Sequence, residues 1–332
     1  MAKIISLNSK KKKIFNNVKK YFSNINPKKL KPSKWTVPIG GGYYDENEVN
    51  SVIDCYLKGH LSTQIPVNQF EKNFSKYIGI KYAVATNSGT SANILALNTL
   101  IENGELNKGD KVAIPATTFI SVATPIIQLG LVPVYIDVKK DLNMNIDELS
   151  IAIKKYKNIK CVMIVHTLGM PADMLKLKKL CKKRKIVIIE DCCEAHGATI
   201  NNKKIGSFGD ISTWSFYVAH NMTTAEGGMV LMKSKKYYSI CSELREFGRL
   251  KSYKGQRYGF SQKIKKNGLS EYDERYVFHR IGWNFRMSDA PAAFGIQQLK
   301  KLDKMNSKRI KNAEFLIDKL SKFPQLEFTR YK

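Results

Sequence analysis

Residues 82–101, YAVATNSGTSANILALNTLI, predict a short strand that runs directly into a helix. The apolar run Tyr82–Thr86 has the length of a strand, and the polar turn Asn87–Ala92 opens a helix that reaches about Ile101. At such a helix start the backbone N–H groups point outward, and the helix dipole favours a negative charge. The stretch therefore predicts a phosphate-binding turn, although Ser-Gly-Thr is also an ordinary helix cap.

The same order of strand and helix repeats along the chain. We expect further strands at residues 112–114, 134–138, 161–166, 186–190, 212–217 and 229–232. We expect helices at residues 46–57, 68–77, 118–129, 146–156, 174–183, 236–247, 288–302 and 307–320. Apolar runs of strand length that alternate with helices are typical of βαβ units around a mostly parallel sheet, with helices covering both faces. The predicted fold class is therefore α/β.

Three polar segments follow strands of this predicted sheet. Ligands of parallel α/β sheets collect at the carboxyl ends of the strands, so we expect Asn87–Thr90, Asp191 and His220 near one crevice. A carboxylate at the position of Asp191 can hold a protonated ring nitrogen by a charge-assisted hydrogen bond. It can equally bind a metal or cap the next helix.

His220 lies in residues 213–228, TWSFYVAHNMTTAEGG, where a predicted strand gives way to a polar loop that closes on two glycines. A single histidine is often a structural residue. An imidazole with an ordinary pKa of ~6.5 is also largely a neutral base at pH 7. The residues around His220 leave both interpretations open.

Cys192, Cys193 and His196 follow Asp191 closely. Adjacent cysteines are poorly spaced to share one tetrahedral ion, and no second ligand pair is present in the sequence, so we expect no metal. The six cysteines include no CxxC motif, and four lie in or beside apolar runs. This usage predicts reduced, partly buried thiols in a cytosolic protein.

The 332 residues can bury a substantial core, and an apolar content of 43% is typical of a globular protein. No apolar run reaches the ~18 residues of a membrane helix, and the N-terminus lacks the apolar block of a signal peptide. We therefore expect a cytoplasmic protein without membrane insertion.

The net charge of +28 raises the question of a nucleic-acid partner. Eleven of these charges are lysines between Lys3 and Lys34, a segment without acidic residues. Residues 1–34 are predicted to form a basic mobile arm with one amphipathic turn near residues 14–22. Such charge suits a solvated surface or an anion-binding one, but no zinc-finger, RNP-like or helix-turn-helix motif is present. We therefore expect no nucleic-acid partner.

Seven sequence blocks in a fixed order carry a resemblance to a known family. They are NSGTSANILAL (87–97), PIIQLGLVPVYIDV (125–138), HTLGMPADM (166–174), EDCCEAHGA (190–198), GSFGDISTWSFY (206–217), AEGG (225–228) and GWNFRMSD (282–289). From about Thr36 to Leu320 the chain resembles the DegT/DnrJ/EryC1/StrS family of pyridoxal-phosphate (PLP) enzymes, which act on nucleotide-linked sugars. The resemblance implies the fold-type-I PLP-dependent aminotransferase architecture and a homodimer with shared active sites.

By position, the resemblance assigns several residues to the cofactor. Those that would hold its phosphate are Gly89, Thr90, Ser215 and, from the neighbouring subunit, Asn284. Phe119 would stack on the pyridine ring, and Asp191 would pair with the ring nitrogen. Glu194 stands where aminotransferases of the family have a glutamine near the ring hydroxyl, and an acceptor-only carboxylate there would have to take the phenol's proton.

The departure from the aminotransferase pattern is His220. Sugar aminotransferases of the family have at this position the lysine that binds the cofactor covalently, and imidazole has no primary amine with which to do so. A base is retained while the covalent anchor is lost, which suits a cofactor that arrives as pyridoxamine phosphate (PMP) with its own amine.

This substitution resembles the 3-dehydratase branch of the family, which removes the C3 oxygen of 4-keto-6-deoxy nucleotide sugars for deoxysugar, lipopolysaccharide or other surface-polysaccharide biosynthesis. By resemblance, His220 removes a proton from the cofactor and the C3 hydroxyl leaves, while the pyridine ring takes up electrons with the help of Asp191. One form of the branch uses L-glutamate to supply the amine. The alternatives are a nucleotide-sugar transaminase, a non-catalytic cofactor or sugar binder, and an anion-binding protein that uses the Lys3–Lys34 arm.

The other form of the branch carries an iron–sulfur cluster. Its ligand pattern would fall on Cys193 and on positions 251, 253 and 261, which here are Lys251, Tyr253 and Ser261. Such a cluster normally needs four thiolates, so we expect none in this chain.

The resemblance also gives a domain organisation. After the arm at residues 1–34, residues 35–290 would form the large PLP-binding α/β domain. Residues 291–332 would begin a small C-terminal domain, which we expect to be truncated because subunits of the family are longer.

Overall fold

A computed structural model of the chain describes residues 2–24, 41–250, 268 and 276–328. The helices are α1 (Ala2–Asn24), α2 (Glu46–Leu57), α3 (Ile65–Ile78), α4 (Gly89–Glu102), α5 (Ile120–Gln128), α6 (Ile146–Lys155), the 3₁₀ turn η2 (Thr167–Gly169), α7 (Met174–Arg184), α8 (Lys235–Arg245) and α10 (Asp289–Leu320). The strands are β1 (Tyr82–Thr86), β2 (Lys111–Pro115), β3 (Val132–Ile136), β4 (Ile159–Val165), β5 (Val187–Asp191), β6 (Thr199–Ile200), β7 (Lys203–Lys204), β8 (Ile211–Ser215) and β9 (Gly228–Met232).

Seven of the strands form one sheet in the order β1-β9-β8-β5-β4-β2-β3. The five strands from β8 to β3 pair in parallel, and β9 pairs antiparallel with both of its neighbours. β9 therefore runs against the other six strands, and the predicted mostly parallel α/β sheet is confirmed. The carboxyl ends of those six strands lie at one edge of the sheet.

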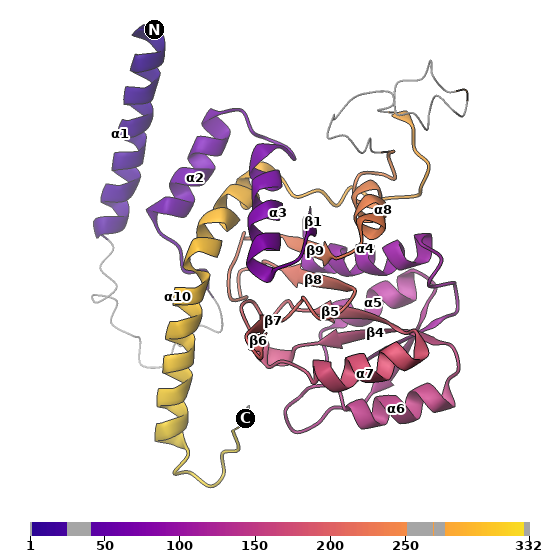
Figure 1. Cartoon of the computed structure of the whole chain (residues 1–332). Coiled ribbons are helices and arrows are strands. Elements are labelled where there is room, and N and C mark those ends of the chain that lie inside the picture. Colours follow the sequence, from indigo (N-terminus) through magenta and orange to yellow (C-terminus); the bar gives the residue numbers. More distant parts are fainter. Residues whose placement is uncertain (1, 25–40, 251–267, 269–275, 329–332) are drawn as a thin grey trace.

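Helices cover both faces of the sheet (Figure 1), because successive strand residues point to opposite sides. Ala83 and Ala85 of β1 join a core with apolar residues of α3, α6, α7 and α10. Val84, between them, joins a second core with residues of α4, α5 and α8. Two apolar layers thus enclose the sheet, which explains why its strands are continuously apolar in sequence.

Helices α2 and α3 each begin where a side chain caps the free backbone N–H groups of the first turn. Asp45 and Glu48 form a reciprocal capping box at the start of α2. The N-terminus of α3 is capped from a distant part of the chain, because Asp289 Oδ1 accepts hydrogen bonds from the backbone N–H groups of Gln64 (2.8 Å) and Val67 (3.2 Å). The first residue of α10 is thereby fixed to the start of α3.

The N-terminal segment differs from the prediction. Residues 2–24 form helix α1, whereas a mobile arm with one amphipathic turn was predicted. Lysine favours helix and the segment contains no glycine or proline, so its charge did not prevent helix formation. α1 packs against α2, Lys11 forms an ion pair with Asp54, and the Phe22 ring contacts that of Tyr44. The rest of the predicted arm, residues 25–34, lies outside the described residues.

The two helices predicted at residues 288–302 and 307–320 are a single helix, α10. Residues 303–306 contain neither glycine nor proline, and buried Met305 continues the apolar stripe after Leu302. Ser307, which resembled a helix start, instead donates its hydroxyl to the Asp303 carbonyl oxygen within the helix (2.8 Å). The predicted domain boundary between residues 290 and 291 falls inside this helix.

Most of the long loop predicted at residues 248–276 lies outside the described residues. None of the described helices combines the length and the apolar content needed to cross a membrane.

Candidate functional site

The turn between β1 and α4 forms the first wall of the candidate site. The Ser88 hydroxyl accepts a hydrogen bond from the Ser91 backbone N–H (3.1 Å) and caps α4. A Cβ atom on Gly89 would lie 2.6 Å from the Ser215 Cβ, so only glycine allows the helix start to approach Ser215 this closely. The predicted phosphate residues Gly89 and Ser215 are therefore neighbours, at a helix N-terminus that favours an anion.

Close packing requires glycine at position 228, the second of the two glycines that follow His220. Thr86 and Ser215 both pair with Gly228, so the ends of β1 and β8 flank the start of β9. A Cβ atom on Gly228 would lie 2.2 Å from the Ser88 carbonyl oxygen. Gly228 thus lets β9 begin directly beneath the turn that opens α4.

Asp191 lies at the carboxyl end of β5 and is only 4% exposed. Its Oδ2 accepts a hydrogen bond from Asn93 Nδ2 (3.1 Å), and its Oδ1 accepts one from the Cys193 backbone N–H (3.1 Å). A carboxylate has about four acceptor positions, so Asp191 can also accept from a protonated ring nitrogen. The helix start at Gly89, beside Ser215, and the carboxylate of Asp191 together fit a ring cofactor that carries a phosphate.

Asn93 is not among the predicted site residues, although its spacing from Gly89 could have indicated it. It lies four residues after Gly89 on α4, and residues at that spacing share one face of a helix. Its Nδ2 also donates to the Ser121 carbonyl oxygen (3.0 Å), which ties the start of α5 to Asp191. Asn93 therefore fixes the position of the carboxylate relative to the segment that carries Phe119.

Glu190 precedes Asp191 and points to the opposite face of the sheet, as alternation along a strand requires. It is fully buried and accepts hydrogen bonds from the backbone N–H groups of Gly206 (2.9 Å), Phe208 (2.8 Å) and Gly209 (2.5 Å). Burial by itself would raise the pKa of Glu190, but the bonds from His166 and from these N–H groups outweigh it and lower that pKa. Glu190 is therefore a buried carboxylate that joins β5 to the loop before β8.

His166, Glu190 and Cys192 lie close enough together to suggest a metal site. The Ala172 N–H donates to His166 Nδ1 (3.1 Å), so the ring hydrogen is on Nε2, which donates to Glu190 Oε2 (3.2 Å). The Cys192 thiol donates to the Glu190 carbonyl oxygen (3.6 Å), and burial raises its pKa well above the usual range. These contacts join the three side chains and the Ala172 backbone in one buried hydrogen-bond network.

His220 ends the turn that follows β8, where its backbone N–H donates to the Tyr217 carbonyl oxygen (3.0 Å). The centroid of its ring is 6.2 Å from that of Tyr217 and 6.3 Å from that of His196. Burial lowers the pKa of His220, while the negative charges of Glu194 and Asp191 partly oppose this effect. The imidazole is therefore neutral at pH 7 and lies within the field of two carboxylates.

His196 packs behind His220 and is almost completely buried. Its ring contacts those of Trp214 and Phe216, with centroid separations of 5.2 Å and 5.7 Å. Burial, with a smaller contribution from His220, lowers the pKa of His196 to about 3. His196 is therefore a neutral packing residue, and of the two histidines His220 is the candidate base.

Two side chains of helix α10 hold the backbone at His196 and at Asn221, next to His220. The sequence does not indicate these contacts. Asn306 Nδ2 donates to the His196 carbonyl oxygen (2.7 Å), and the Arg309 guanidinium donates to the Asn221 carbonyl oxygen (3.0 Å). Both residues come from the C-terminal part of the described chain and reach segments about 90 to 110 positions earlier. No local signal in the sequence could have identified them.

The other predicted residues occupy more open positions. Glu194 Oε2 accepts a hydrogen bond from the Leu168 backbone N–H (2.6 Å). Phe119 precedes α5 and is 75% exposed, and Thr90 is exposed in the first turn of α4. Asn284 is exposed too, and its Oδ1 accepts from Arg286 Nε (2.9 Å).

The segment that carries Asn284 lies beside the turn between β1 and α4, because the Asn87 N–H donates to the Phe285 carbonyl oxygen (2.9 Å). No disulfide joins any of the six cysteines, of which five are buried and Cys193 is partly exposed. Positions 251, 253 and 261 of the cluster pattern lie outside the described residues.

A mostly parallel sheet with a glycine at a helix start and a buried aspartate at its carboxyl edge fits the aminotransferase-like class of PLP-dependent proteins. The chain belongs to the DegT/DnrJ/EryC1/StrS aminotransferase family, which its sequence matches over residues 43–331.

Known proteins of this family are similar along most of the chain. The lipopolysaccharide biosynthesis protein RfbH of Salmonella typhimurium is 34% identical over 88% of this chain and 68% of its own length. The GDP-perosamine synthase of Vibrio cholerae is 30% identical over 87% of this chain and 72% of its own length. The matched segment covers between 63 and 74% of four curated relatives, so these relatives are longer than the part that they share with the chain.

A solved structure of a GDP-4-keto-6-deoxymannose-3-dehydratase with a trapped PLP–glutamate geminal diamine superposes with a TM-score of 0.79. It is 30% identical in sequence and covers 87% of this chain and 74% of its own. The predicted fold-type-I aminotransferase-like architecture is thereby confirmed.

Proposed function

We propose that the protein is a PLP/PMP-dependent 3-dehydratase of a nucleotide-linked 4-keto-6-deoxy sugar, in which His220 is the base. The observation that carries the proposal is the neutral imidazole of His220 at the strand-end position where aminotransferases of the family have a lysine. An imidazole can accept a proton but cannot bind the cofactor covalently. The site therefore suits a cofactor that is held by non-covalent contacts alone.

The residues for such contacts are available. Gly89, Thr90 and Ser215 would hold the phosphate, and the buried carboxylate of Asp191 would pair with the ring nitrogen. Phe119 would stack on the ring, and Glu194 would lie near its hydroxyl group. When bound, the cofactor supplies an amine for the C4 ketone and a ring that takes up the electrons released with a proton.

His220 performs the proton transfer in this proposal. Because burial lowers its pKa, the ring is neutral at pH 7 and its free nitrogen can accept the proton. The imidazolium that forms is stabilised by the charges of Glu194 and Asp191, which favour its protonated state. The same proton is then available to the C3 hydroxyl group, which leaves as water.

One mixing assay tests the reaction. The protein is incubated with PLP, L-glutamate and a GDP-linked 4-keto-6-deoxy sugar, and the sugar is analysed by mass spectrometry. We expect loss of the C3 oxygen, with no product when the cofactor or glutamate is omitted. Gain of an amino group at C4 would instead establish a transaminase, the reaction suggested by the similarity to GDP-perosamine synthases. An unchanged sugar would favour a non-catalytic binder.

The pKa of His220 gives a pH prediction. A lowered pKa keeps the imidazole neutral to a lower pH, so the acid limb of kcat/KM should have its midpoint below pH ~6.5. Glu194→Gln removes a negative charge that raises this pKa, and its amide oxygen can still accept from the Leu168 N–H. The acid limb should therefore move to still lower pH.

The matched control for this measurement is Glu148→Gln, which makes the same change at an exposed position on α6. Its pH profile should coincide with that of the wild-type protein. A shift of the acid limb toward higher pH in Glu194→Gln would contradict the assignment of His220 as the titrating base.

We also propose that the enzyme acts as a homodimer. The fold leaves large apolar side chains exposed near segments of the site, among them Phe119, Ile120 and Ile281, of which Ile281 is 89% exposed. Such side chains favour a partner surface, and Asn284 lies in the same segment as Ile281. In a dimer, Asn284 would reach the cofactor phosphate of the neighbouring subunit.

A further inference from the structure

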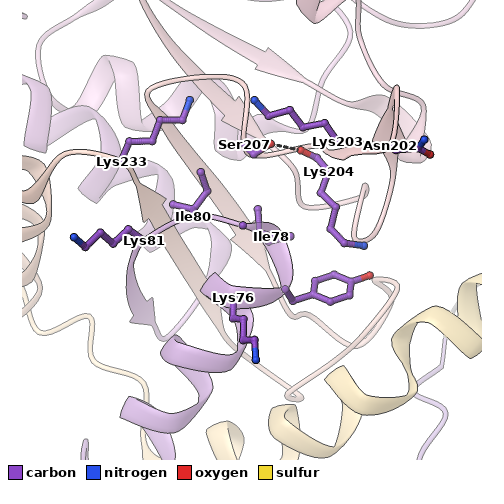
Figure 2. A pocket seen from close by; sticks show the side chains of 11 residues that line it. Lys76, Ile78, Ile80, Lys81, Asn202, Lys203, Lys204, Ser207 and Lys233 are labelled. Carbon is purple, nitrogen blue, oxygen red and sulfur yellow. Dashed lines mark hydrogen bonds between the residues drawn. The ribbon is translucent and has the colours of Figure 1, made fainter.

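Five lysines surround a hollow at the sheet edge opposite the candidate active site (Figure 2). The hollow measures about 540 Å³ and is lined by Lys76, Tyr77, Ile78, Gly79, Ile80, Lys81, Asn202, Lys203, Lys204, Ser207 and Lys233. No aspartate or glutamate is among these lining residues. Three segments that are far apart in sequence thus bring positive charge to one place.

Strand register places this hollow away from the cofactor site. Tyr82 and Ile211 both pair with Met232, so the starts of β1 and β8 and the end of β9 lie in one row. Lys81 and Lys233 directly adjoin this row. Gly89 and Ser215 belong to the opposite edge, about four residues or ~13 Å further along the strands. A ligand of the hollow would therefore not be the cofactor of the candidate site.

Three of the lysines are held in position by contacts with aromatic rings or backbone carbonyl oxygens, which carry no formal negative charge. Lys204 Nζ lies 3.9 Å from the centroid of the Tyr77 ring, and Lys203 Nζ lies 4.8 Å from that of Phe208. Lys233 Nζ donates to the carbonyl oxygens of Phe208 (3.1 Å) and Gly209 (2.6 Å). Within the described part of the chain, no carboxylate forms an ion pair with any of the five lysines.

Other lysines of the chain do find acidic partners. Lys11 and Lys58 pair with Asp54, and Lys301 pairs with Asp45 and Glu48. Burial lowers the pKa of Lys233, and repulsion by Lys178 and Lys203 adds to this shift, while the charges of Glu190 and Asp210 oppose it. A bound anion with several charges would relieve this repulsion, and the ring and carbonyl contacts reduce the entropy lost when it binds.

We propose that this lysine-lined hollow is a binding site for a diphosphate group, distinct from the cofactor site. Its lining contains only two aliphatic side chains, Ile78 and Ile80, at its floor, so charge rather than apolar contact determines the ligand. Multiply charged phosphate matches a hollow that is lined by five lysines from three segments of the chain. The inference is independent of the proposed dehydratase activity.

Calorimetric titration with inorganic pyrophosphate tests the site. The protein is first saturated with PMP, which closes the cofactor site and has no aldehyde that could react with lysines. We expect binding at ~0.15 M salt, and an affinity lower by a factor of about 10 to 100 in the triple variant Lys81→Ser, Lys203→Ser, Lys204→Ser. The matched control, Lys154→Ser, Lys155→Ser, Lys182→Ser, removes the same charge from exposed positions on α6 and α7 and should bind as the wild-type protein does.

Two further titrations define the ligand. ADP distinguishes an organic from an inorganic diphosphate, and binding of either one that is lost in the pocket variant supports the site. Sulfate serves as a doubly charged anion without a second phosphate group and should bind much more weakly. The proposal is wrong if the two triple variants lose the same affinity, if neither loses any, or if sulfate binds as tightly as pyrophosphate. Circular dichroism establishes that both variants are folded.

Discussion

Replacing His220 with lysine is expected to abolish the proposed dehydration and to create a covalent attachment point for the cofactor. Loss of a positioned general base costs a factor of about 10² to 10⁴ in rate, and lysine, with an ordinary pKa of ~10.4, is protonated at pH 7. The primary amine can form an imine with PLP, which imidazole cannot. Borohydride followed by peptide mass spectrometry should therefore find the cofactor on residue 220 in the variant and on no residue of the wild-type protein.

Two variants control this experiment. His60→Lys introduces the same change before α3, at a residue that is not among those assigned to the cofactor, and should neither trap the cofactor nor lose activity. His220→Asn lacks both the base and the amine, so it should lose dehydration without gaining a covalent adduct. Cofactor trapped on any lysine of the wild-type chain would contradict the non-covalent site.

Glu190→Gln is expected to destabilise the protein by about 1–3 kcal/mol, because it leaves buried hydrogen-bond donors without an acceptor. The wild-type carboxylate is fully buried and accepts from the ring of His166 and from three backbone N–H groups at residues 206–209. An amide group has only one oxygen, so its nitrogen would face donors that have no other acceptor. The midpoint of urea unfolding, followed by circular dichroism, measures the loss.

The control is Glu314→Gln, an identical change at an exposed position on α10, where we expect little change in the midpoint. The effect of Glu190 should also depend on pH. Its folded-state pKa is lowered, so its contribution is present above the ordinary glutamate pKa of ~4.3 and is lost as the pH falls through the folded-state value. Equal unfolding midpoints for the two variants at pH 7 would show that the network contributes nothing.

The adjacent residues Glu190 and Asp191 have different roles, because Glu190 belongs to a buried structural network and Asp191 belongs to the candidate site. Successive side chains of β5 point to opposite faces, so Glu190 joins the network of His166 while Asp191 meets Asn93. Neither face can be identified from the sequence, because both faces of a parallel sheet are buried and the strand has no alternating pattern. The two adjacent carboxylates are distinguished only when their partners are known.

The elements that rest on local signals were predicted well. Helix α2 has the predicted bounds because a capping box starts it and a turn before Gly59 ends it, and β1 has the predicted bounds because a polar turn follows it. The prediction failed where the signal was ambiguous. Ser307 resembles a helix start, so the sequence predicts two helices where the structure has α10 alone. Lysine suits both a solvated coil and a helix, so the sequence predicts an arm where the structure has α1.

The sequence by itself determined the α/β class, the family and the imidazole at position 220, because residue types and their order are local properties of the chain. Tertiary structure decided which residues meet. Asn93 reaches Asp191, Asn306 and Arg309 brace the loop of His220, and lysines from three segments surround one hollow. These contacts join positions about 90 to 160 residues apart, and their partners are set by strand order and helix packing, which no local pattern encodes.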